Sequence, residues 1–333
     1  MWEGRKMLKV INSGVETVVE DWPGRIGYLD NGMAASGAFD NVALGFANLL
    51  VGNPVNEAGI EIAGGYFEAE FGVDTVIAVT GTDMKPTLND QPIRLWESMK
   101  VKKGDVIKFS YFGQFGFRSY LGVAGGIDVP VYLGSKSTCI FGSYGGFQGR
   151  KLQEGDVLKF GKPAVSLKGY KERKVKKERI PKYETEWHMR AIPGMNAYPD
   201  YVSKEGMDYL FEHAHKIQHS SNRSAYRLEA SKINLFTRKD GGVAGSHPSN
   251  VLDHAYAIPG ALNICGDTPI LLIADGPTLG GYLCALSVIY ADLWKIGQGT
   301  PGRDFVRFVY CTPEEAVKAR KEQKELLSTK SLI

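Results

Sequence analysis

Short apolar or alternating segments, separated by Gly, Pro, Asn and Asp, make up most of residues 8–160. Examples are Thr75–Thr80, Val106–Tyr111 and Tyr120–Val123. Segments of this length between turn-forming residues are typical of β-strands. A second region of the same character begins at Trp187. The pattern therefore predicts a mainly β fold.

Helical spacing interrupts this pattern near the N-terminus. Asp40 precedes the interruption, and Gly52-Asn53-Pro54 follows it. The apolar positions between them repeat with the period of an α-helix, and they are Ala43, Leu44, Ala47, Leu50 and Val51. We expect a helix that is capped by Asp40 and ends before Gly52.

A short sequence is repeated along the chain. Lys103–Phe109 and Glu154–Phe160 both contain Gly-Asp followed by a strand-like run, and Gly302–Phe308 is a degenerate third copy. In a Gly-Asp turn, glycine adopts positive φ readily and the aspartate side chain binds nearby backbone. Each copy therefore predicts a turn that leads into a strand, rather than a catalytic motif.

A basic segment separates the two β-rich regions. Residues 168–182 contain eight Lys or Arg residues and two Glu residues, with little apolar periodicity, so we expect this part to be exposed and mobile. Thr312-Pro-Glu-Glu315 has the sequence of a helix capping box. The expected divisions are an N-terminal β-rich subdomain at 1–165, a basic linker or loop at 166–184, a C-terminal β-rich subdomain at 185–312, and a helix and tail at 313–333.

The composition is that of an ordinary globular protein, with 43% hydrophobic and 23% charged residues. No apolar stretch has the length of a membrane span or of a signal peptide. The net charge of +3 arises in the basic segment, so the rest of the chain offers no basic surface. The four cysteines form no C-x-x-C pair. We expect a soluble, cytoplasmic protein with free thiols, no nucleic-acid partner and no membrane partner.

The most distinctive segment is Ala274-Asp-Gly-Pro-Thr-Leu-Gly-Gly-Tyr282, which follows the apolar run Pro269–Ile273. A glycine-rich loop after a strand lets backbone N–H groups, here around Gly280 and Gly281, approach an anionic or carbonyl ligand. Asp275, at the start of the loop, is placed to accept hydrogen bonds from an amide substrate. The alternative is a tight turn in which Asp275 binds its own backbone.

A second candidate cluster lies in Ser220–Leu228. Asn222 and Arg223 fall at an expected turn, and Arg227 falls near the start of a strand. A guanidinium group in this place holds a carboxylate or polarises an oxygen. A structural ion pair explains the same residues equally well.

A third cluster is Gly245–Asn250, which offers His247 and Asn250 on an expected loop. Asp253 and His254 follow close behind. Polar side chains of this density indicate either a ligand site or a well-bonded turn.

Several common chemistries have no support in the sequence. The N-terminal glycine-rich loops contain neither a P-loop nor a dinucleotide-binding motif, and no G-x-S-x-G nucleophile elbow occurs. His213, His215 and His219 lack an accompanying Cys or carboxylate pattern. No metal site is predicted.

Ordered motifs run through nearly the whole chain. They are Asp21-Trp-Pro-Gly-Arg25, Ser36-Gly-Ala-Phe-Asp40, Ala47-Asn-Leu-Leu-Val-Gly-Asn53, Thr80-Gly81, Tyr120–Pro130, Leu133-Gly-Ser-Lys-Ser-Thr138, Gly145-Gly146, Gly149-Arg150, Ser221-Asn-Arg223, His247-Pro-Ser-Asn250, Ala274–Tyr282 and Ala291-Asp-Leu-Trp294. Together they resemble a biotin-dependent carboxyltransferase family, the urea amidolyase-related proteins. This family includes the C subunit of 5-oxoprolinase and one half of the carboxyltransferase domain of urea carboxylase. The motif sequences resemble the urea carboxylase branch more closely. The 5-oxoprolinase branch favours an Asp-His-Gln-Thr-Thr-Gly-Gly-type loop, whereas this chain has Asp275-Gly-Pro-Thr-Leu-Gly-Gly281.

The resemblance implies two cyclophilin-like β-barrel subdomains with a few short helices, and an active site shared with a smaller partner subunit. It also implies transfer of a carboxyl group from carboxybiotin to a urea- or amide-type nitrogen of a small substrate. No Ala-Met-Lys-Met biotin-attachment sequence occurs, since Met84-Lys85 lacks that context, and no ATP-binding signature is present. Biotin would therefore be held by another protein or domain, and a biotin carrier and a biotin carboxylase are the expected further partners.

In such a mechanism a carboxylate orients or deprotonates the substrate nitrogen, and cationic or amide donors stabilise developing oxyanion charge. Asp275 is the predicted catalytic carboxylate. The predicted substrate-binding residues are Asn222, Arg223, His247, Asn250, Gly280 and Gly281. Two alternatives remain within the same family: a component of ATP-dependent 5-oxoprolinase with a lactam-hydrolysing partner, and a non-catalytic regulatory protein that antagonises a kinase inhibitor.

Overall fold

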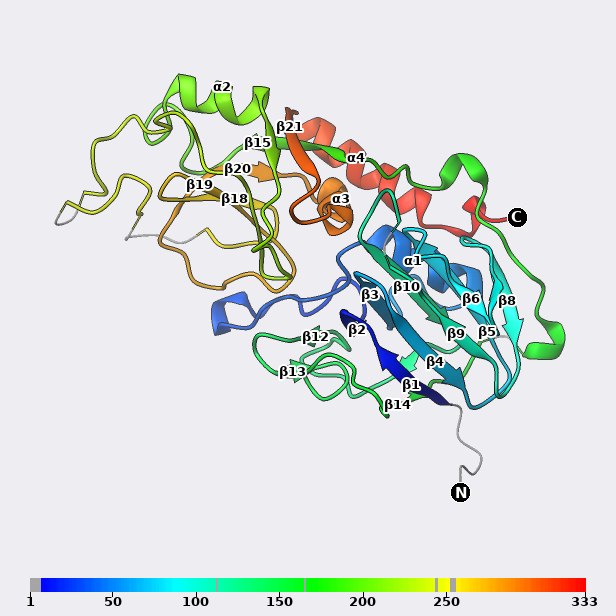
Figure 1. Ribbon diagram of the computed structural model, residues 1–333. Helices are drawn as coiled ribbons and strands as arrows, with labels where there is room; N and C mark the ends of the chain where they lie inside the picture. The colour runs from blue at the N-terminus through cyan, green and yellow to red at the C-terminus, as the bar shows by residue number, and fades with distance from the viewer. Residues whose placement is uncertain (1–6, 112, 165, 243–244, 252–255) are drawn as a thin grey trace. The chain divides into compact units, whose positions relative to one another are not determined.

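The computed structural model describes residues 7–111, 113–164, 166–242, 245–251 and 256–333 (Figure 1). Within these residues the chain divides into two compact units. Unit 1 consists of the described parts of Met1–Ile26, Ser36–Tyr183 and Gln323–Ile333, and unit 2 of those of Gly27–Ala35 and Glu184–Glu322. The sequence pattern does not predict that residues 27–35 belong to unit 2 or that residues 323–333 belong to unit 1.

Unit 1 is built mainly from antiparallel strands (Figure 1). One sheet has the order β11-β14-β1-β4-β9-β6-β7, another has the order β2-β3-β10-β5-β8, and β12 pairs with β13. The strands are β1 (Met7–Ser13), β2 (Glu16–Glu20), β3 (Gly59–Ala63), β4 (Phe67–Phe71), β5 (Thr75–Gly81), β6 (Thr87–Leu88), β7 (Gln91–Pro92), β8 (Ser98–Val101), β9 (Val106–Lys108), β10 (Arg118–Val123), β11 (Ile127–Asp128), β12 (Thr138–Cys139), β13 (Tyr144–Gly145) and β14 (Val157–Phe160).

The two larger sheets of unit 1 share one hydrophobic core. Leu8 and Phe71 from the first sheet and Ile60 and Leu121 from the second belong to the same buried cluster. Burial of such side chains is the main favourable contribution to folding. Every residue of β3, β5 and β10 is buried, because α1 (Asn41–Val51) also packs on these strands.

The predicted helix near the N-terminus is confirmed as α1. Asp40 Oδ1 accepts a hydrogen bond from the Ala43 N–H at 2.8 Å, and Gly52 ends the helix with a φ of 82°. Gly122 of β10 allows the close approach of the helix, since a Cβ atom there would lie 2.8 Å from the backbone of Ala47.

The repeated Gly-Asp sequence forms the predicted turns. Gly104 and Gly155 have φ values of 90° and 85° and precede β9 and β14. Asp105 Oδ2 accepts from the Lys102 N–H at 2.7 Å, and Asp156 Oδ2 accepts from the Gln153 N–H at the same distance. The two copies therefore close their turns with the same hydrogen bond.

Unit 2 contains one mixed sheet with the order β16-β21-β15-β20-β18-β19-β17 among its described residues. β15 and β21 are parallel, and the other neighbouring pairs are antiparallel. The strands are β15 (Glu186–Pro193), β16 (Ala214–Lys216), β17 (Ala225–Arg227), β18 (Ala261–Cys265), β19 (Thr268–Leu272), β20 (Leu283–Val288) and β21 (Phe305–Tyr310). The fold is thus mainly β, as predicted.

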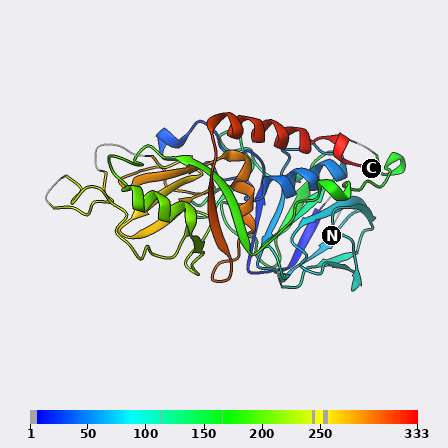
Figure 2. The ribbon, with the colours of Figure 1, turned by 90° about the horizontal axis from the view of Figure 1, so that it is seen from above.

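Helices accompany this sheet. α2 (Lys204–Glu212) lies beside β21 and α3 (Leu293–Gln298) beside β15 (Figure 2). α4 (Pro313–Leu326) follows the predicted capping box, in which the Thr312 N–H donates to Glu315 Oε2 at 2.8 Å and the Glu315 N–H donates to Thr312 Oγ1 at 3.2 Å. The sequence pattern predicts α4 but not α2 or α3.

The basic segment is an anchored loop rather than a free linker. Tyr170 and Val175 are buried, with exposed fractions of 6% and 5%. Arg173 Nη1 donates to the Leu49 carbonyl at 3.0 Å, and the Tyr170 hydroxyl donates to the Leu50 carbonyl, so the segment is attached to α1. The charge pattern of the sequence does not reveal this attachment, because it depends on the burial of Tyr170 and Val175 and on the hydrogen bonds of Tyr170 and Arg173.

We expect limited trypsin digestion to cut this segment at Lys177 and Arg179 before Arg173. The first two residues are exposed in a short 3-10 turn, whereas Arg173 is held against α1. Mass spectrometry of the early fragments measures the order of cleavage. Early cleavage after Arg173, or none at Lys177 and Arg179 while other sites are cut, would contradict this prediction.

Candidate active site

The loop Ala274–Tyr282 connects β19 to β20 in unit 2. β17 pairs with β19 in a register that places Ala225 opposite Leu272. Arg223 lies just before β17 and Asp275 lies just after β19, so the antiparallel pairing brings these two residues together. The structure thus joins two of the predicted site residues that are far apart in sequence.

Arg223 and Asp275 form a buried ion pair. Arg223 Nε donates to Asp275 Oδ2 at 3.0 Å, and the Asp275 backbone N–H donates to the Arg223 carbonyl at 3.0 Å. The exposed fractions of the two residues are 3% and 4%. Asp275 Oδ1 is also buried, but it has no hydrogen-bond partner among the described residues. One carboxylate oxygen is therefore fixed by protein, and the other is left without a donor.

Asn222 has a different position and role. Its side chain is exposed, and Oδ1 accepts hydrogen bonds from the N–H groups of Ser224 and Ala225 at 2.9 and 3.3 Å. This is an Asx-type turn that shapes the backbone on both sides of Arg223. Asn222 thus contributes to the position of the ion pair.

His247 and Asn250 lie in a separate segment, residues 245–251, which is hydrogen-bonded to the far end of the Ala274–Tyr282 loop. The Asn250 N–H donates to the His247 carbonyl at 2.9 Å, and the Val251 N–H donates to the Gly281 carbonyl at 2.8 Å. His247 Nδ1 accepts from the Ser249 N–H at 3.1 Å. These bonds connect the third predicted cluster to Gly281. Asp253 and His254 lie outside the described residues.

Arg238 also contributes to this part of the site, although the sequence pattern does not predict it. Its Nε donates to the Pro248 carbonyl at 2.9 Å, and its Nη2 donates to the Asn250 carbonyl, so its guanidinium fixes the turn that carries His247. No local pattern distinguishes this arginine in the sequence. Only the folded chain shows its partner, ten or more residues away.

The surface of the Ala274–Tyr282 loop is open. Gly280 is exposed and Gly281 is half-buried, with a φ of 118° that favours glycine. Leu279, next to them, is 80% exposed.

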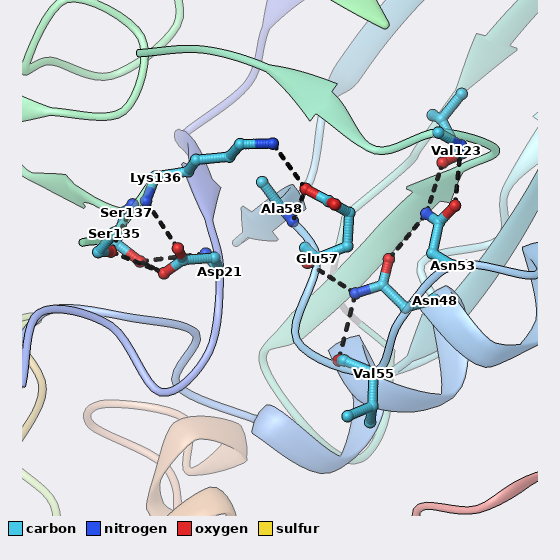
Figure 3. A network of polar contacts seen from close by, with 11 residues as sticks. Asp21, Asn48, Asn53, Val55, Glu57, Ala58, Val123, Ser135, Lys136 and Ser137 are labelled. Carbon is cyan, nitrogen blue, oxygen red and sulfur yellow. Dashed lines mark hydrogen bonds and ion pairs between the residues drawn. The ribbon is translucent and has the colours of Figure 1, made fainter. Parts of the chain in front are cut away.

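The N-terminal motifs form a polar network in unit 1 (Figure 3). Asp21 Oδ2 accepts from the Lys136 N–H at 2.6 Å, and Lys136 Nζ donates to Glu57 Oε1 at 2.8 Å. Asn48 Nδ2 donates to the Glu57 carbonyl at 2.7 Å and Asn53 Nδ2 donates to Asn48 Oδ1 at 3.1 Å. These side chains connect the Asp21–Arg25, Ala47–Asn53 and Leu133–Thr138 motifs and account for them structurally.

Asp40, the predicted cap of α1, is another fully buried carboxylate. Its Oδ1 caps α1, and its Oδ2 accepts from the Tyr183 hydroxyl at 2.9 Å. The Asp40 N–H donates to the Tyr120 hydroxyl at 2.7 Å. Burial, together with the nearby Glu61 and Asp40 carboxylates, raises the pKa of Tyr120 well above its usual value. Both oxygens of Asp40 are thus engaged in holding unit 1 together.

A cavity of about 770 Å³ in unit 2 is lined by residues of α2 and β16. His213 and His215 are among its lining residues, and none of the predicted site residues is. His213 stacks on Tyr209, and burial lowers the pKa of His215. Within the described residues, no three His, Cys, Asp or Glu side chains come together as a metal site. No helix in that part of the chain is both long enough and apolar enough to cross a bilayer.

The protein is thus mainly β, and its candidate site is the buried carboxylate of Asp275 at the start of a glycine-rich loop. One oxygen of this carboxylate accepts from Arg223, and the other has no hydrogen-bond partner among the described residues. Residues 31–310 match the family model described as carboxyltransferase domain, subdomain A and B. The chain belongs to this family.

Individual relatives agree with the family. The chain is 37% identical over 328 residues to a urea amidolyase of Lachancea kluyveri, covering 96% of this chain but 18% of that protein. It is 34% identical over 325 residues to the C subunit of the Escherichia coli 5-oxoprolinase, covering 95% of both chains. The crystal structure of the Kluyveromyces lactis urea carboxylase superposes with a TM-score of 0.91 and 34% identity, over 99% of this chain and 31% of that one.

Proposed function

We propose that this chain is a component of a biotin-dependent carboxyltransferase that carboxylates a urea- or amide-type nitrogen. The observation that carries the proposal is Asp275 Oδ1, a buried carboxylate oxygen without a hydrogen-bond partner among the described residues. Buried acceptors are usually satisfied, so an exception of this kind points to a ligand that donates. The N–H groups of urea and of amides are such donors.

The Arg223 ion pair supports a chemical role for Asp275. Because Arg223 Nε donates to Oδ2 at 3.0 Å, the carboxylate is held in place and points Oδ1 in a fixed direction. Oδ1 would accept a substrate N–H and then the proton that this nitrogen loses as it becomes the nucleophile. Biotin, bound to its carrier elsewhere, would supply the carboxyl group.

The remaining predicted residues would complete the pocket. The backbone around Gly280 and Gly281 would approach the substrate closely, and His247 and Asn250 would provide donors at the far end of the loop. Asn222 would act through the position of Arg223.

A second protein or domain would cover the exposed face of the loop. Leu279 is the apolar side chain placed to meet it. The urea amidolyase relative is much longer than this chain, and the Escherichia coli relative is by its name one subunit of an enzyme. We therefore expect a smaller partner of the same family, with a biotin carrier and a biotin carboxylase, in the cytoplasm.

A second candidate function is that of a 5-oxoprolinase component. It is favoured by the match to the Escherichia coli protein, which covers 95% of both chains. The lactam N–H of 5-oxoproline would be the donor to Asp275 Oδ1. In this case the further partner would be a lactam-hydrolysing subunit, and biotin would have no part.

We expect a complex co-purified with the smaller partner to show ATP- and bicarbonate-dependent turnover of urea or guanidine when carrier and carboxylase are added. Avidin should abolish this turnover, because it sequesters biotin. Avidin-insensitive turnover of 5-oxoproline would instead support the second candidate. If this chain elutes unchanged beside a folded smaller partner, and no substrate is consumed, both enzyme functions are wrong.

A further inference from the structure

Arg25 of unit 1 is a fully buried cation, with an exposed fraction of 0%. Its Nε donates to the Tyr132 carbonyl at 3.1 Å and its Nη2 to the Ser137 carbonyl at 2.5 Å. Nη1 is buried and has no hydrogen-bond partner among the described residues, and none of the described carboxylates forms an ion pair with this side chain. A buried charge without a counter-charge is costly and is rarely retained without a function.

Asp21, close to Arg25 in sequence, does not neutralise it. The Asp21 carboxylate accepts instead from the hydroxyls of Ser135 and Ser137 and from the Lys136 N–H (Figure 3). Its lone pairs are used by neutral donors and by backbone. The positive charge of Arg25 therefore has no acidic group to balance it from this motif.

Two tyrosine rings contact the Arg25 guanidinium. Its Cζ atom lies 4.9 Å from the ring centroid of Tyr144 and 5.6 Å from that of Tyr132. The rings are 5.7 Å apart and inclined at 40°. Cation–π contacts of this kind reduce the cost of burial but leave the Nη1 hydrogens without an acceptor.

A cavity of about 420 Å³ adjoins this group. Tyr132, Tyr144 and Gly145 line the cavity and also contact Arg25. Gly145 is required for this arrangement, because a Cβ atom there would lie 2.3 Å from Arg25 Nη2. The guanidinium thus lies directly behind the cavity wall. The lining itself carries one exposed cation, Lys159, which pairs across the strands with the exposed carboxylate of Asp128.

We propose that this cavity binds a small carboxylate, whose oxygen accepts from Arg25 Nη1 between the rings of Tyr132 and Tyr144. Guanidinium and carboxylate form charge-assisted hydrogen bonds, and the ligand would provide the missing counter-charge. The volume suits a small metabolite. The site belongs to unit 1, involves none of the residues proposed for carboxyl transfer, and does not depend on that function.

The test is titration of the whole chain with acetate, succinate and phosphate at constant ionic strength, followed by thermal shift and calorimetry. We expect saturable binding of a carboxylate, weakened at least tenfold in Arg25→Gln. Lys159→Gln should weaken it about threefold, through loss of an exposed charge near the ligand. Lys100→Gln is the matched control, an exposed strand lysine outside the cavity lining, and should bind as the unmodified chain does.

Arg25→Gln also removes structural hydrogen bonds and is used only if its circular dichroism is unchanged. If it does not fold, two measurements decide: the comparison of Lys159→Gln with Lys100→Gln, and a crystal soaked in succinate, with the ligand expected in this cavity. The proposal is overturned if no carboxylate binds saturably, if only phosphate binds, if both lysine variants bind alike, or if the succinate lies elsewhere.

Discussion

Asp275→Asn is expected to lower turnover of the assembled enzyme by about 10²-fold or more, as loss of a general base typically does. The amide oxygen would remain at the Oδ2 position, where Arg223 Nε donates at 3.0 Å. The amide nitrogen would then occupy the Oδ1 position, and it cannot accept a substrate N–H. Steady-state kinetics of the complex with each candidate substrate measures the effect.

Loss of the carboxylate charge also weakens a buried ion pair, so the control must match that change. Asp292→Asn is suitable, because Asp292 is buried in the same unit and accepts from Arg190 Nη2 at 2.7 Å and Nε at 2.9 Å. Although burial opposes its charged form, the Arg190 hydrogen bonds and Lys295 lower the pKa of Asp292, and both of its carboxylate oxygens accept from Arg190.

Both variants should lose stability, whereas only Asp275→Asn should lose turnover at a temperature where both remain folded. Partner binding, measured by size-exclusion chromatography, should be nearly intact in each. Turnover of Asp275→Asn within a factor of two of the unmodified enzyme would make Asp275 a structural residue and move the carboxylate to Asp253 or to the partner.

Glu61→Gln is expected to lower the free energy of unfolding of unit 1 by about 3–5 kcal/mol, the usual cost of breaking a buried ion pair. Glu61 accepts from Arg118 Nε at 3.2 Å, the Tyr120 hydroxyl at 2.7 Å and the Phe39 N–H at 2.9 Å. Each of these three partners is a donor, so a glutamine would place its own NH₂ group against one of them. Urea denaturation followed by tryptophan fluorescence measures the change.

Asp90→Asn serves as the comparison, because it breaks an exposed ion pair with Lys108 in the same unit. Its effect should stay within about 0.5 kcal/mol. Equal effects of the two substitutions would show that the Glu61 network contributes little to stability.

Local chemistry explains why some elements could be predicted from the sequence. The Asp40 cap, the Thr312–Glu315 capping box and the Gly-Asp turns each depend on residues within four positions of one another, and all three are confirmed. α2 was missed although Ser203 caps it, with its Oγ accepting from the Gly206 N–H at 2.9 Å. The helix has only nine residues, several of them charged, so its sequence shows little apolar periodicity.

The site shows the same distinction between local and distant contacts. The glycine-rich loop and its aspartate were visible as a local motif, but the sequence left open whether Arg223 pairs with a ligand or with protein. That choice depends on the register of β17 and β19, which is a tertiary property. Arg25 is likewise visible in the sequence only as part of a motif. Its hydrogen-bond partners lie more than a hundred residues away, so neither its burial nor the missing partner of Nη1 could be predicted.

The anchoring of the basic loop has a consequence for synthesis on the ribosome. Lys174 and Lys176 donate their backbone N–H groups to the carbonyls of Ile333 and Ser331, and Val175 pairs with Leu332. Because domains fold as the chain emerges from its N-terminal side, the loop lacks these partners until translation has passed residue 333. A nascent chain stalled before that point would expose Val175, which is buried in the complete chain, together with its neighbouring lysines.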